Sequence, residues 1–355
     1  MGGAWPKLVS RAWLWQPFTR DWYSTNTGSA VSIRQAVLLP ASKLVSSIAL
    51  WRHKQRIVDR QQIPPIVVVG NMVVGGGGKT PLIAHLCESL RNQGHRPAIL
   101  AHGYGAVISR ASLVFPDSDP REFSDEAVML AQQTNAPVYV APTRLEAYAL
   151  IKQNQAIDIV LCDDGLQHVQ LPRAFEIACF DVRGIGNGKV LPAGPLREPI
   201  KCALTVDAIV TASASPIAHP HVFQSRTISL EVRHLNDPND GKSYPSLAQW
   251  AGGRKHIHAV AGIANPDTFF AQLDAVGLEH TDHPLRDHAW PNDLLVSDLK
   301  AQCVLMTEKD AVKWQKIMRA QGLIDPHWFA LKIKRDTTPN LAQLIERTLF
   351  EPETN

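Results

Sequence analysis

The sequence predicts an α/β protein whose larger domain is a doubly wound, mostly parallel sheet. Three observations support this prediction. Short apolar runs alternate with helical stretches from Ile66 onward, a glycine-rich turn follows the first run, and the alternation restarts after about residue 226. Parallel strands are buried on both faces, so they read as continuous apolar runs joined by crossover helices. We therefore expect a second, smaller α/β domain after the first.

The predicted strands of the first domain are valine- and isoleucine-rich runs: Ile66–Val69, Ala98–Ala101, Val138–Val140, Ile157–Cys162, Ile177–Phe180 and Ala208–Thr211. Helical spacing of apolar residues predicts the intervening helices Leu82–Gln93, Asp125–Gln133 and Leu145–Gln153. A linking strand is expected at Thr227–Val232. The second domain then repeats the pattern, with strands at His256–Ala261, Cys303–Met306 and Phe329–Lys334 and a helix at Pro266–Val276.

The chain of 355 residues is long enough to bury two cores. We divide it into a basic amphipathic segment at 1–62, the main sheet domain at 63–225, and linker strands with the smaller domain at 226–355. A net charge of +3 argues against nucleic acid as the main partner. Five dispersed cysteines without a CxxC pair favour reduced thiols in a cytosolic compartment. No apolar run approaches the roughly 20 residues of a membrane span, and no secretory signal is expected.

A basic amphipathic helix is predicted from Pro40 to about Asp59. Leu44, Ile48 and Trp51 recur at helical spacing, and lysines and arginines surround them. The pattern alone fits a helix that packs on the protein's own core with a solvated basic face. Tryptophan beside basic residues also favours a membrane surface, because indole rings prefer the headgroup region and cations prefer anionic lipid.

The glycine-rich turn between Gly70 and Pro81 predicts a phosphate-binding loop. Gly75, Gly76, Gly77 and Gly78 precede Lys79 and Thr80. Such a loop turns backbone N–H groups toward phosphate oxygens, while the lysine reaches the β- and γ-phosphates and the threonine hydroxyl ligates Mg²⁺. The strict pattern requires glycine where this chain has Val73, so this is a variant loop. The sequence therefore indicates a P-loop NTPase-like kinase that uses ATP and Mg²⁺.

Two adjacent carboxylates follow a later strand of the same predicted sheet. Ile157–Cys162 leads directly into Asp163 and Asp164. The carboxyl ends of parallel strands face the ligand crevice, so either aspartate can bind Mg²⁺ directly or through water. Ordinary turn chemistry also explains an Asp-Asp-Gly sequence. Because the pair comes after a phosphate loop in the sequence, we interpret it as a metal site.

Several further residues have both a catalytic and a structural interpretation. Asp125 is either a catalytic carboxylate or an acidic residue favoured in a first helical turn. Arg197, in the proline-rich segment Leu191–Pro199, either binds phosphate or is simply solvated. His288 either transfers protons or lies on the surface. Thr307–Lys313 opens a helix with the spacing of a capping box, which we interpret as structural.

Taken together, these motifs resemble those of the tetraacyldisaccharide 4′-kinase family, the lipid A 4′-kinases of Gram-negative bacteria. The resemblance extends from about Trp22 to Phe329 and is specific because the motifs occur in order. They are Gly70–Pro81, Gly103–Gly105, Asp125–Glu126, Asp163–His168, Gly186–Gly188, Leu191–Pro199, Val260–Ala264, Asp287–His288 and Thr307–Lys313.

The resemblance implies transfer of the ATP γ-phosphate to the 4′-hydroxyl of a tetraacylated disaccharide 1-phosphate. It places the enzyme as a peripheral protein at the cytoplasmic face of the inner membrane, where the N-terminal helix meets the bilayer, and implies no obligate protein partner. The implied fold is a P-loop core and a smaller lobe joined by a two-stranded linker, with the active site between the lobes.

The same resemblance implies a role for each matching residue. Lys79 and Thr80 handle phosphate and magnesium, and Asp163 with Asp164 completes the metal site. Asp125 accepts the hydroxyl proton with help from His288. The lipid headgroup is positioned by Tyr104, Arg144, His168 and Arg197.

This chain departs from the family pattern at Ala101-His102, at Ser124 and Ala127, and at Ala174, none of which has an implied catalytic role. Two other functions remain open on sequence alone. One is a P-loop ATPase or GTPase of the metallochaperone type, which hydrolyses nucleotide without a lipid acceptor. The other is a non-catalytic nucleotide-binding membrane adaptor, which binds ATP without transferring phosphate.

Overall fold

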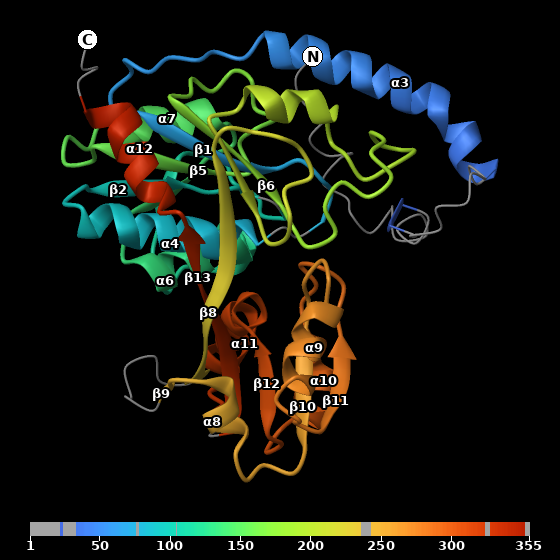
Figure 1. Cartoon of the computed structure of the whole chain (residues 1–355). Coiled ribbons are helices and arrows are strands. Elements are labelled where there is room, and N and C mark those ends of the chain that lie inside the picture. The colour runs from blue at the N-terminus through green and yellow to red at the C-terminus, as the bar shows by residue number, and fades with distance from the viewer. Residues whose placement is uncertain are drawn as a thin grey trace. The chain divides into compact units, whose positions relative to one another are not determined.

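The computed structural model describes residues 22–23, 33–75, 78–103, 105–235, 243–323 and 327–351 (Figure 1). The chain divides into two compact units, which we describe separately. Unit 1 takes Met1–Ala101, Thr143–Arg226 and Thr337–Asn355, and unit 2 takes His102–Pro142 and Thr227–Asp336.

The two units differ from the predicted domains at two places. Residues 102–142, predicted within the main sheet domain, belong to unit 2, and the C-terminal residues from Thr337 belong to unit 1. Two strands are shared between the units. β8 (Val222–His234) enters unit 2 at Thr227, and β13 (Trp328–Thr338) returns to unit 1 at Thr337. A division into consecutive segments cannot describe units that are each made of separate parts of the chain.

The sheet of unit 1 is built around parallel strands whose residues are all buried. In spatial order they are β7 (Ala208–Thr211), β6 (Phe175–Phe180), β1 (Ile66–Asn71), β5 (Ile159–Asp163) and β2 (Pro97–Leu100) (Figure 1). The first residues of β8 continue this sheet beside β7. The predicted runs are therefore strands. Val69 of β1 lies opposite Asp163 of β5, so the loops after both strands leave the same edge of the sheet. This edge is where ligands bind in open parallel sheets.

Helices complete unit 1. α4 (Lys79–Asn92) packs against β1, β2 and β5, α7 (Arg144–Ile151) packs against β2, and α12 (Leu341–Phe350) packs on α4. The short 3-10 helix η2 (Ile200–Thr205) follows the proline-rich segment. α3 begins at Ile33, upstream of the predicted start, and runs to Lys54 with Pro40 inside it. The helix therefore starts before the apolar spacing of Leu44, Ile48 and Trp51 on which the prediction was based.

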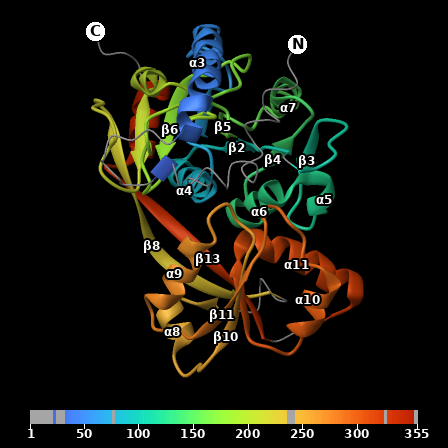
Figure 2. The same cartoon turned by 90° about the vertical axis from the view of Figure 1, so that its right-hand side faces the viewer.

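Unit 2 has its own parallel sheet, in the order β11 (His280–Pro284), β10 (Ile257–Ala261), β12 (Val304–Thr307) and β13. Figure 2 labels β11, β10 and β13 in a second view. Its helices are α5 (Pro120–Phe123), α6 (Asp125–Thr134), α8 (Leu247–Ala251), α9 (Asp267–Asp274), α10 (Asp293–Asp298) and α11 (Glu308–Gln321). β3 (Ser112–Val114) pairs antiparallel with β4 (Val138–Val140), and β8 pairs antiparallel with β9 (Ser243–Tyr244). The run Val138–Val140 is thus a strand, but it belongs to unit 2.

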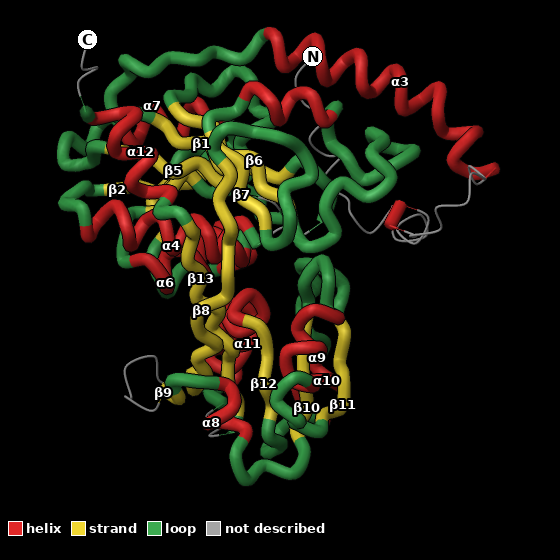
Figure 3. The backbone as a smooth tube through the Cα atoms, viewed as in Figure 1, coloured by secondary structure: helices red, strands yellow, loops and turns green. Residues whose placement is uncertain are grey.

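Both faces of the unit 2 sheet are covered. Successive strand residues point to opposite faces, and Ala259 packs in a cluster with Trp250 and Phe269, whereas Val260 packs with Trp314 and Trp328. Figure 3 shows the strands of this sheet and helix α11, which packs against β12 and also against α6. The packing of α6 on α11 places residues about 180 positions apart in one core.

The residue that follows β10 must be glycine. The Gly262 N–H donates to Asp310 Oδ2 at 2.7 Å, and a Cβ added at Gly262 would lie 2.5 Å from Asp310 Oδ1. Asp310 is fully buried and forms an ion pair with Lys313, so it cannot move aside. We expect Gly262→Ala to lower the free energy of unfolding by about 1–3 kcal/mol, measured by denaturant titration.

Gly252→Ala is the matched control, because Gly252 has a φ of −56° and its nearest neighbour would be 3.4 Å from the new Cβ. Equal stability losses in the two variants would contradict this account of Gly262.

Candidate active site

The predicted phosphate loop lies between β1 and α4. The Asn71 side chain closes the turn by donating to the Gly75 carbonyl at 3.1 Å. Gly75 and Gly78 have φ of 100° and 68°, in the region that favours glycine. Gly78 stands at the N-cap of α4 and offers no side chain to its first N–H groups, which are the groups that bind anions. Gly76 and Gly77 lie outside the described residues.

Lys79, Asp164 and Arg197 form one cluster after this loop. Lys79 Nζ is 3.0 Å from Asp164 Oδ1, and Arg197 NH1 is 2.7 and 2.9 Å from the two oxygens of the same carboxylate. Asp164 has a φ of 51°. Thr80 is the second residue of α4, and Asp163 is buried at the end of β5. The structure therefore brings the phosphate-loop lysine, the carboxylate pair and Arg197 to one edge of the sheet.

Two further arginines hold the segment after β5 in place. Arg144, the first residue of α7, donates to the carbonyls of Ala101 and Asp164 at 3.2 and 3.4 Å. Arg173 is completely buried and donates to the carbonyl of Leu166 at 3.1 Å and to that of His168. Arg144 thus lies beside the cluster and His168 lies in the segment that Arg173 holds, while Tyr104 lies outside the described residues.

The predicted catalytic pair, Asp125 and His288, meets within unit 2. His288 Nδ1 is 3.0 and 3.2 Å from the two Asp125 oxygens, and Asp125 is only 5% exposed. Ser124, the N-cap of α6, adopts a φ of 74° and donates to the His102 carbonyl at 2.9 Å. His288 also has a positive φ, 62°. Two unfavourable backbone conformations therefore flank the contact, and such strain is common at functional sites.

Charge keeps Asp125 ionised. Burial alone raises the pKa of its carboxyl group, but the Lys309 charge, the hydrogen bond from His288 and the Lys313 charge outweigh it and hold the pKa far below the usual range. For His288, burial lowers the pKa and the hydrogen bond to Asp125 raises it, with a net rise. Asp125 is accordingly a carboxylate at neutral pH.

The sequence interpretation missed Lys309 and Lys313. The Thr307 hydroxyl does cap α11 by accepting from the Asp310 N–H at 3.2 Å, so the structural interpretation of this motif holds. However, the same helix turns Lys309 toward Asp287 and His288, and Lys313 toward Asp125 at 3.7 Å. The signal in the sequence is two lysines at i and i+4 in a helix whose start we interpreted as structural.

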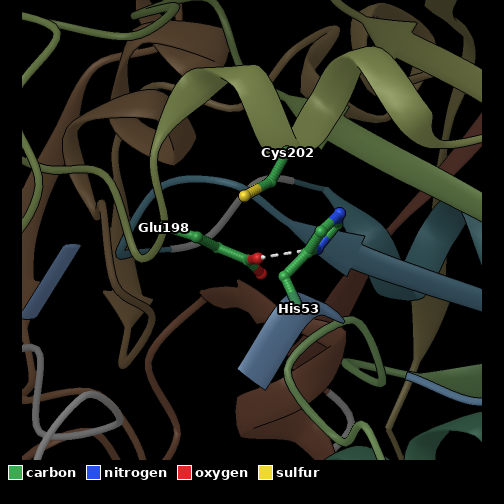
Figure 4. Close-up of side chains that lie close together, drawn as sticks. All are labelled: His53, Glu198 and Cys202. Carbon is green, nitrogen blue, oxygen red and sulfur yellow. Dashed lines mark ion pairs between the residues drawn. The ribbon is translucent and has the colours of Figure 1, made fainter. Parts of the chain in front are cut away.

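One group in the described part of the chain has metal-ligand chemistry, namely His53, Glu198 and Cys202 (Figure 4). Burial and the Glu198 charge raise the pKa of the Cys202 thiol to about 12, and the thiol is hydrogen-bonded to Glu198. His53 Nε2 accepts from Arg56 at 2.9 Å, and its Nδ1 is 3.5 Å from Glu198. A protonated thiol is a poor metal ligand. We interpret the group as a bridge from α3 to the segment that carries Arg197.

Removing a buried charge that holds the segment after β5 should be costly. Arg173→Met breaks its ion pair with Glu176, 3.0 Å away, and leaves the carbonyls of Leu166 and His168 without this donor. We expect a loss of about 3 kcal/mol in the free energy of unfolding, measured with denaturant. Arg96→Met is the control, since the 66% exposed Arg96 side chain pairs with Asp158 at the surface. A loss no larger than in the control would contradict the assigned role of Arg173.

The comparisons with known proteins agree with one another, and each match covers most of the chain. A family model described as tetraacyldisaccharide-1-P 4′-kinase matches residues 34–349. The tetraacyldisaccharide 4′-kinase of Nitrosococcus oceani is 39% identical over 318 residues, covering 87% of this chain and 88% of that protein. The protein of the same name from Dechloromonas aromatica is 37% identical over 318 residues, covering 88% of this chain and 92% of that protein. The one from Herminiimonas arsenicoxydans is 40% identical over 321 residues, covering 87% of this chain and 88% of that protein.

A solved structure has the same fold. The crystal structure of LpxK from Aquifex aeolicus in complex with ATP matches 90% of this chain and 100% of that chain, with a TM-score of 0.70 and 23% sequence identity. The likeness confirms the predicted mixed α/β fold with a large, mostly parallel sheet.

Proposed function

The chain belongs to the tetraacyldisaccharide-1-P 4′-kinase family, and from this premise we propose how its residues act in the reaction. It is a tetraacyldisaccharide 4′-kinase of lipid A biosynthesis. The donor we propose is ATP, and the acceptor is the 4′-hydroxyl of a tetraacyldisaccharide 1-phosphate. The two alternatives left open by the sequence, a nucleotide-hydrolysing switch and a non-catalytic adaptor, are set aside because the family match covers nearly the whole chain.

The residues of unit 1 bind the nucleotide in this proposal. The N-terminus of α4 and the loop of Gly75 to Gly78 hold the phosphates, and Lys79 moves from Asp164 to the phosphate oxygens, since a lysine ammonium bonds to either. Thr80, Asp163 and Asp164 supply the hard oxygen ligands that Mg²⁺ prefers, and they come from adjoining ends of β5 and α4. Bound Mg²⁺ would neutralise charge on the β- and γ-phosphates.

Arg197 and its neighbours position the acceptor in this proposal. Arg197 is a guanidinium held beside Asp164, able to form two parallel hydrogen bonds to a phosphate or sugar oxygen. Arg144 and His168 lie on the segments that border this cluster. With Tyr104 they would contact the lipid headgroup.

Asp125 accepts the proton of the acceptor hydroxyl in this proposal, and the Asp125–His288 contact is the observation that carries this assignment. A carboxylate with a lowered pKa is a weak base. In phosphoryl transfer the transition state is loose, so charge neutralisation and alignment lower the barrier more than a strong base does, and the proton leaves late. His288 fixes the direction of the carboxylate.

Membrane contact through α3 completes the proposal. Its exposed apolar residues, Val37, Leu44, Ile48 and Trp51, recur at helical spacing, and Lys43 and Lys54 are exposed beside them. This combination suits a helix lying in the membrane interface. No described helix is long and apolar enough to cross a bilayer. We therefore propose a peripheral enzyme on the cytoplasmic face of the inner membrane, where its acylated substrate lies.

The direct test of the proposed reaction is an assay of the full chain with ATP, Mg²⁺ and a tetraacyldisaccharide 1-phosphate in detergent micelles. We expect a product with a second phosphate at the 4′ position and nucleotide consumption that depends on the lipid. Nucleotide hydrolysis at the same rate without lipid would contradict the proposed acceptor. Binding of ATP with no transfer would instead support an adaptor.

Asp125→Asn tests the proposed proton acceptor. The amide keeps the shape of the carboxylate but removes its charge and basicity, so we expect kcat to fall at least about 100-fold. The affinity for ATP should stay within about twofold, since the nucleotide ligands are in unit 1. Equilibrium binding of ATP and steady-state kinetics measure the two quantities. Wild-type turnover in this variant would remove Asp125 from the mechanism.

The membrane role of α3 is tested by the triple change Leu44→Ser, Ile48→Ser and Trp51→Ser. These side chains are 64%, 36% and 64% exposed, so their loss should not disturb the core. We expect binding to vesicles of anionic phospholipid to weaken at least about tenfold in a flotation assay. The control changes Ile63, Ile228 and Leu294 to serine, which are exposed by 82%, 62% and 75%. Equal binding by the two triple variants would exclude α3 as the membrane contact.

A further inference from the structure

Lys309 is a buried lysine whose ammonium group has three acceptors around it. It is 9% exposed and lies in the first turn of α11. Its Nζ donates to Asp287 Oδ1 at 2.8 Å, to Glu126 Oε1 at 3.1 Å and to His288 Nε2 at 3.2 Å. An ammonium carries three N–H donors and no acceptor, so each donor has one partner here.

This geometry decides which nitrogen of His288 carries the proton. Because Lys309 can only donate, the Nε2 atom that faces it must present a lone pair. The proton of the neutral ring is then on Nδ1, which donates to Asp125 at 3.0 Å. The opposite tautomer would set two donors against each other at Nε2 and a lone pair against the Asp125 carboxylate. Asp287 Oδ1 lies 3.7 Å from Nε2, beyond hydrogen-bond distance, so the hydrogen-bonded contacts at both ends of the ring favour the same tautomer.

The charge of Lys309 also acts on His288. Asp125 and Asp287 favour the protonated imidazolium, whereas Lys309 opposes it. Glu126 lies against the Lys309 ammonium, and Lys313 lies on the far side of Asp125, 3.7 Å from its Oδ2. Lys309 is thus the cation in direct contact with Nε2, the nitrogen at which His288 would gain a second proton.

We propose that Lys309 is a positioning residue of the phosphoryl transfer, which places the proton of the neutral His288 ring on Nδ1 and so directs it toward Asp125. The proposal rests on the role assigned above to Asp125 and His288. Without Lys309, the His288 ring can flip or gain a proton at Nε2, and it then no longer holds the Asp125 carboxylate in one orientation. Asp125 would then meet the acceptor hydroxyl in a wider range of orientations.

Nitrogen-15 NMR of histidine-labelled protein tests the proposal directly, because the two ring nitrogens differ in chemical shift between tautomers. The His288 signals are assigned by their absence in His288→Asn. In the wild-type protein we expect Nδ1 to carry the proton. A neutral wild-type ring, titrated above its pKa, that carries its proton at Nε2 would overturn the proposal without any variant of Lys309.

The variants add a functional readout. In Lys309→Met we expect His288 to leave the Nδ1–H form and kcat to fall at least about tenfold, with the KM for ATP within about twofold. Because a cation next to His288 is lost, the pKa of the imidazole should rise, and the acidic limb of the kcat profile should move to higher pH. Lys309→Arg, which also only donates, should retain the tautomer. Lys309→Gln is a milder neutral variant in case Lys309→Met does not fold.

Lys316→Met is the matched control, since Lys316 lies on the same helix and pairs with Asp119 at 3.1 Å, away from His288. It should change neither the tautomer nor the pH profile. An unchanged tautomer and pH profile in the folded Lys309→Met or Lys309→Gln protein would overturn the proposal. The NMR result does not depend on kinase activity. Suppose that Lys309→Met changes the tautomer but Asp125→Asn is fully active. The proposed mechanism would then be refuted, whereas the action of Lys309 on the ring would stand.

Discussion

A buried carboxylate stays charged only if cations and hydrogen-bond donors replace the water it has lost, and Asp125 depends on this condition. His288 donates to it, and Lys309 and Lys313 supply positive charge from one face of α11. Since its pKa is lower in the folded than in the unfolded chain, ionised Asp125 stabilises the fold above the ordinary aspartate pKa, and this contribution is lost as the pH falls. The packing of α6 on α11 brings these groups together.

In unit 1, basic side chains likewise surround a carboxylate. Asp164 is flanked by Lys79 and Arg197, so the residues proposed to bind phosphate are held near one another by a carboxylate. Arg197 is followed by Glu198, which is paired with His53 of α3. The contact between His53 and Glu198 therefore joins the helix proposed to meet the membrane to the segment proposed to hold the lipid headgroup.

The sequence predicted those features that depend on local pattern. The buried strands read as valine-rich runs, and the turn from Gly75 to Gly78 with Lys79 marked the phosphate loop, because these depend on residues close together in the chain. The sequence did not predict which unit holds residues 102–142 or what Lys309 does. Lys309 and Glu126 are 183 positions apart, and Asp125 and His288 are 163 apart, so their contacts arise only from tertiary packing. Lysines in a first helical turn also occur commonly on solvated surfaces, and nothing local separates the two cases.

The charge state of Asp125 is the central claim, and carbon-13 NMR of its side-chain carboxyl group measures it most directly. The signal is assigned by comparison with Asp125→Asn. The structure predicts that it keeps the chemical shift of a carboxylate from neutral pH down to about pH 4. A titration with its midpoint at or above the ordinary aspartate value of 3.8 would contradict the account, because the surrounding lysines and His288 would then not be holding Asp125 ionised.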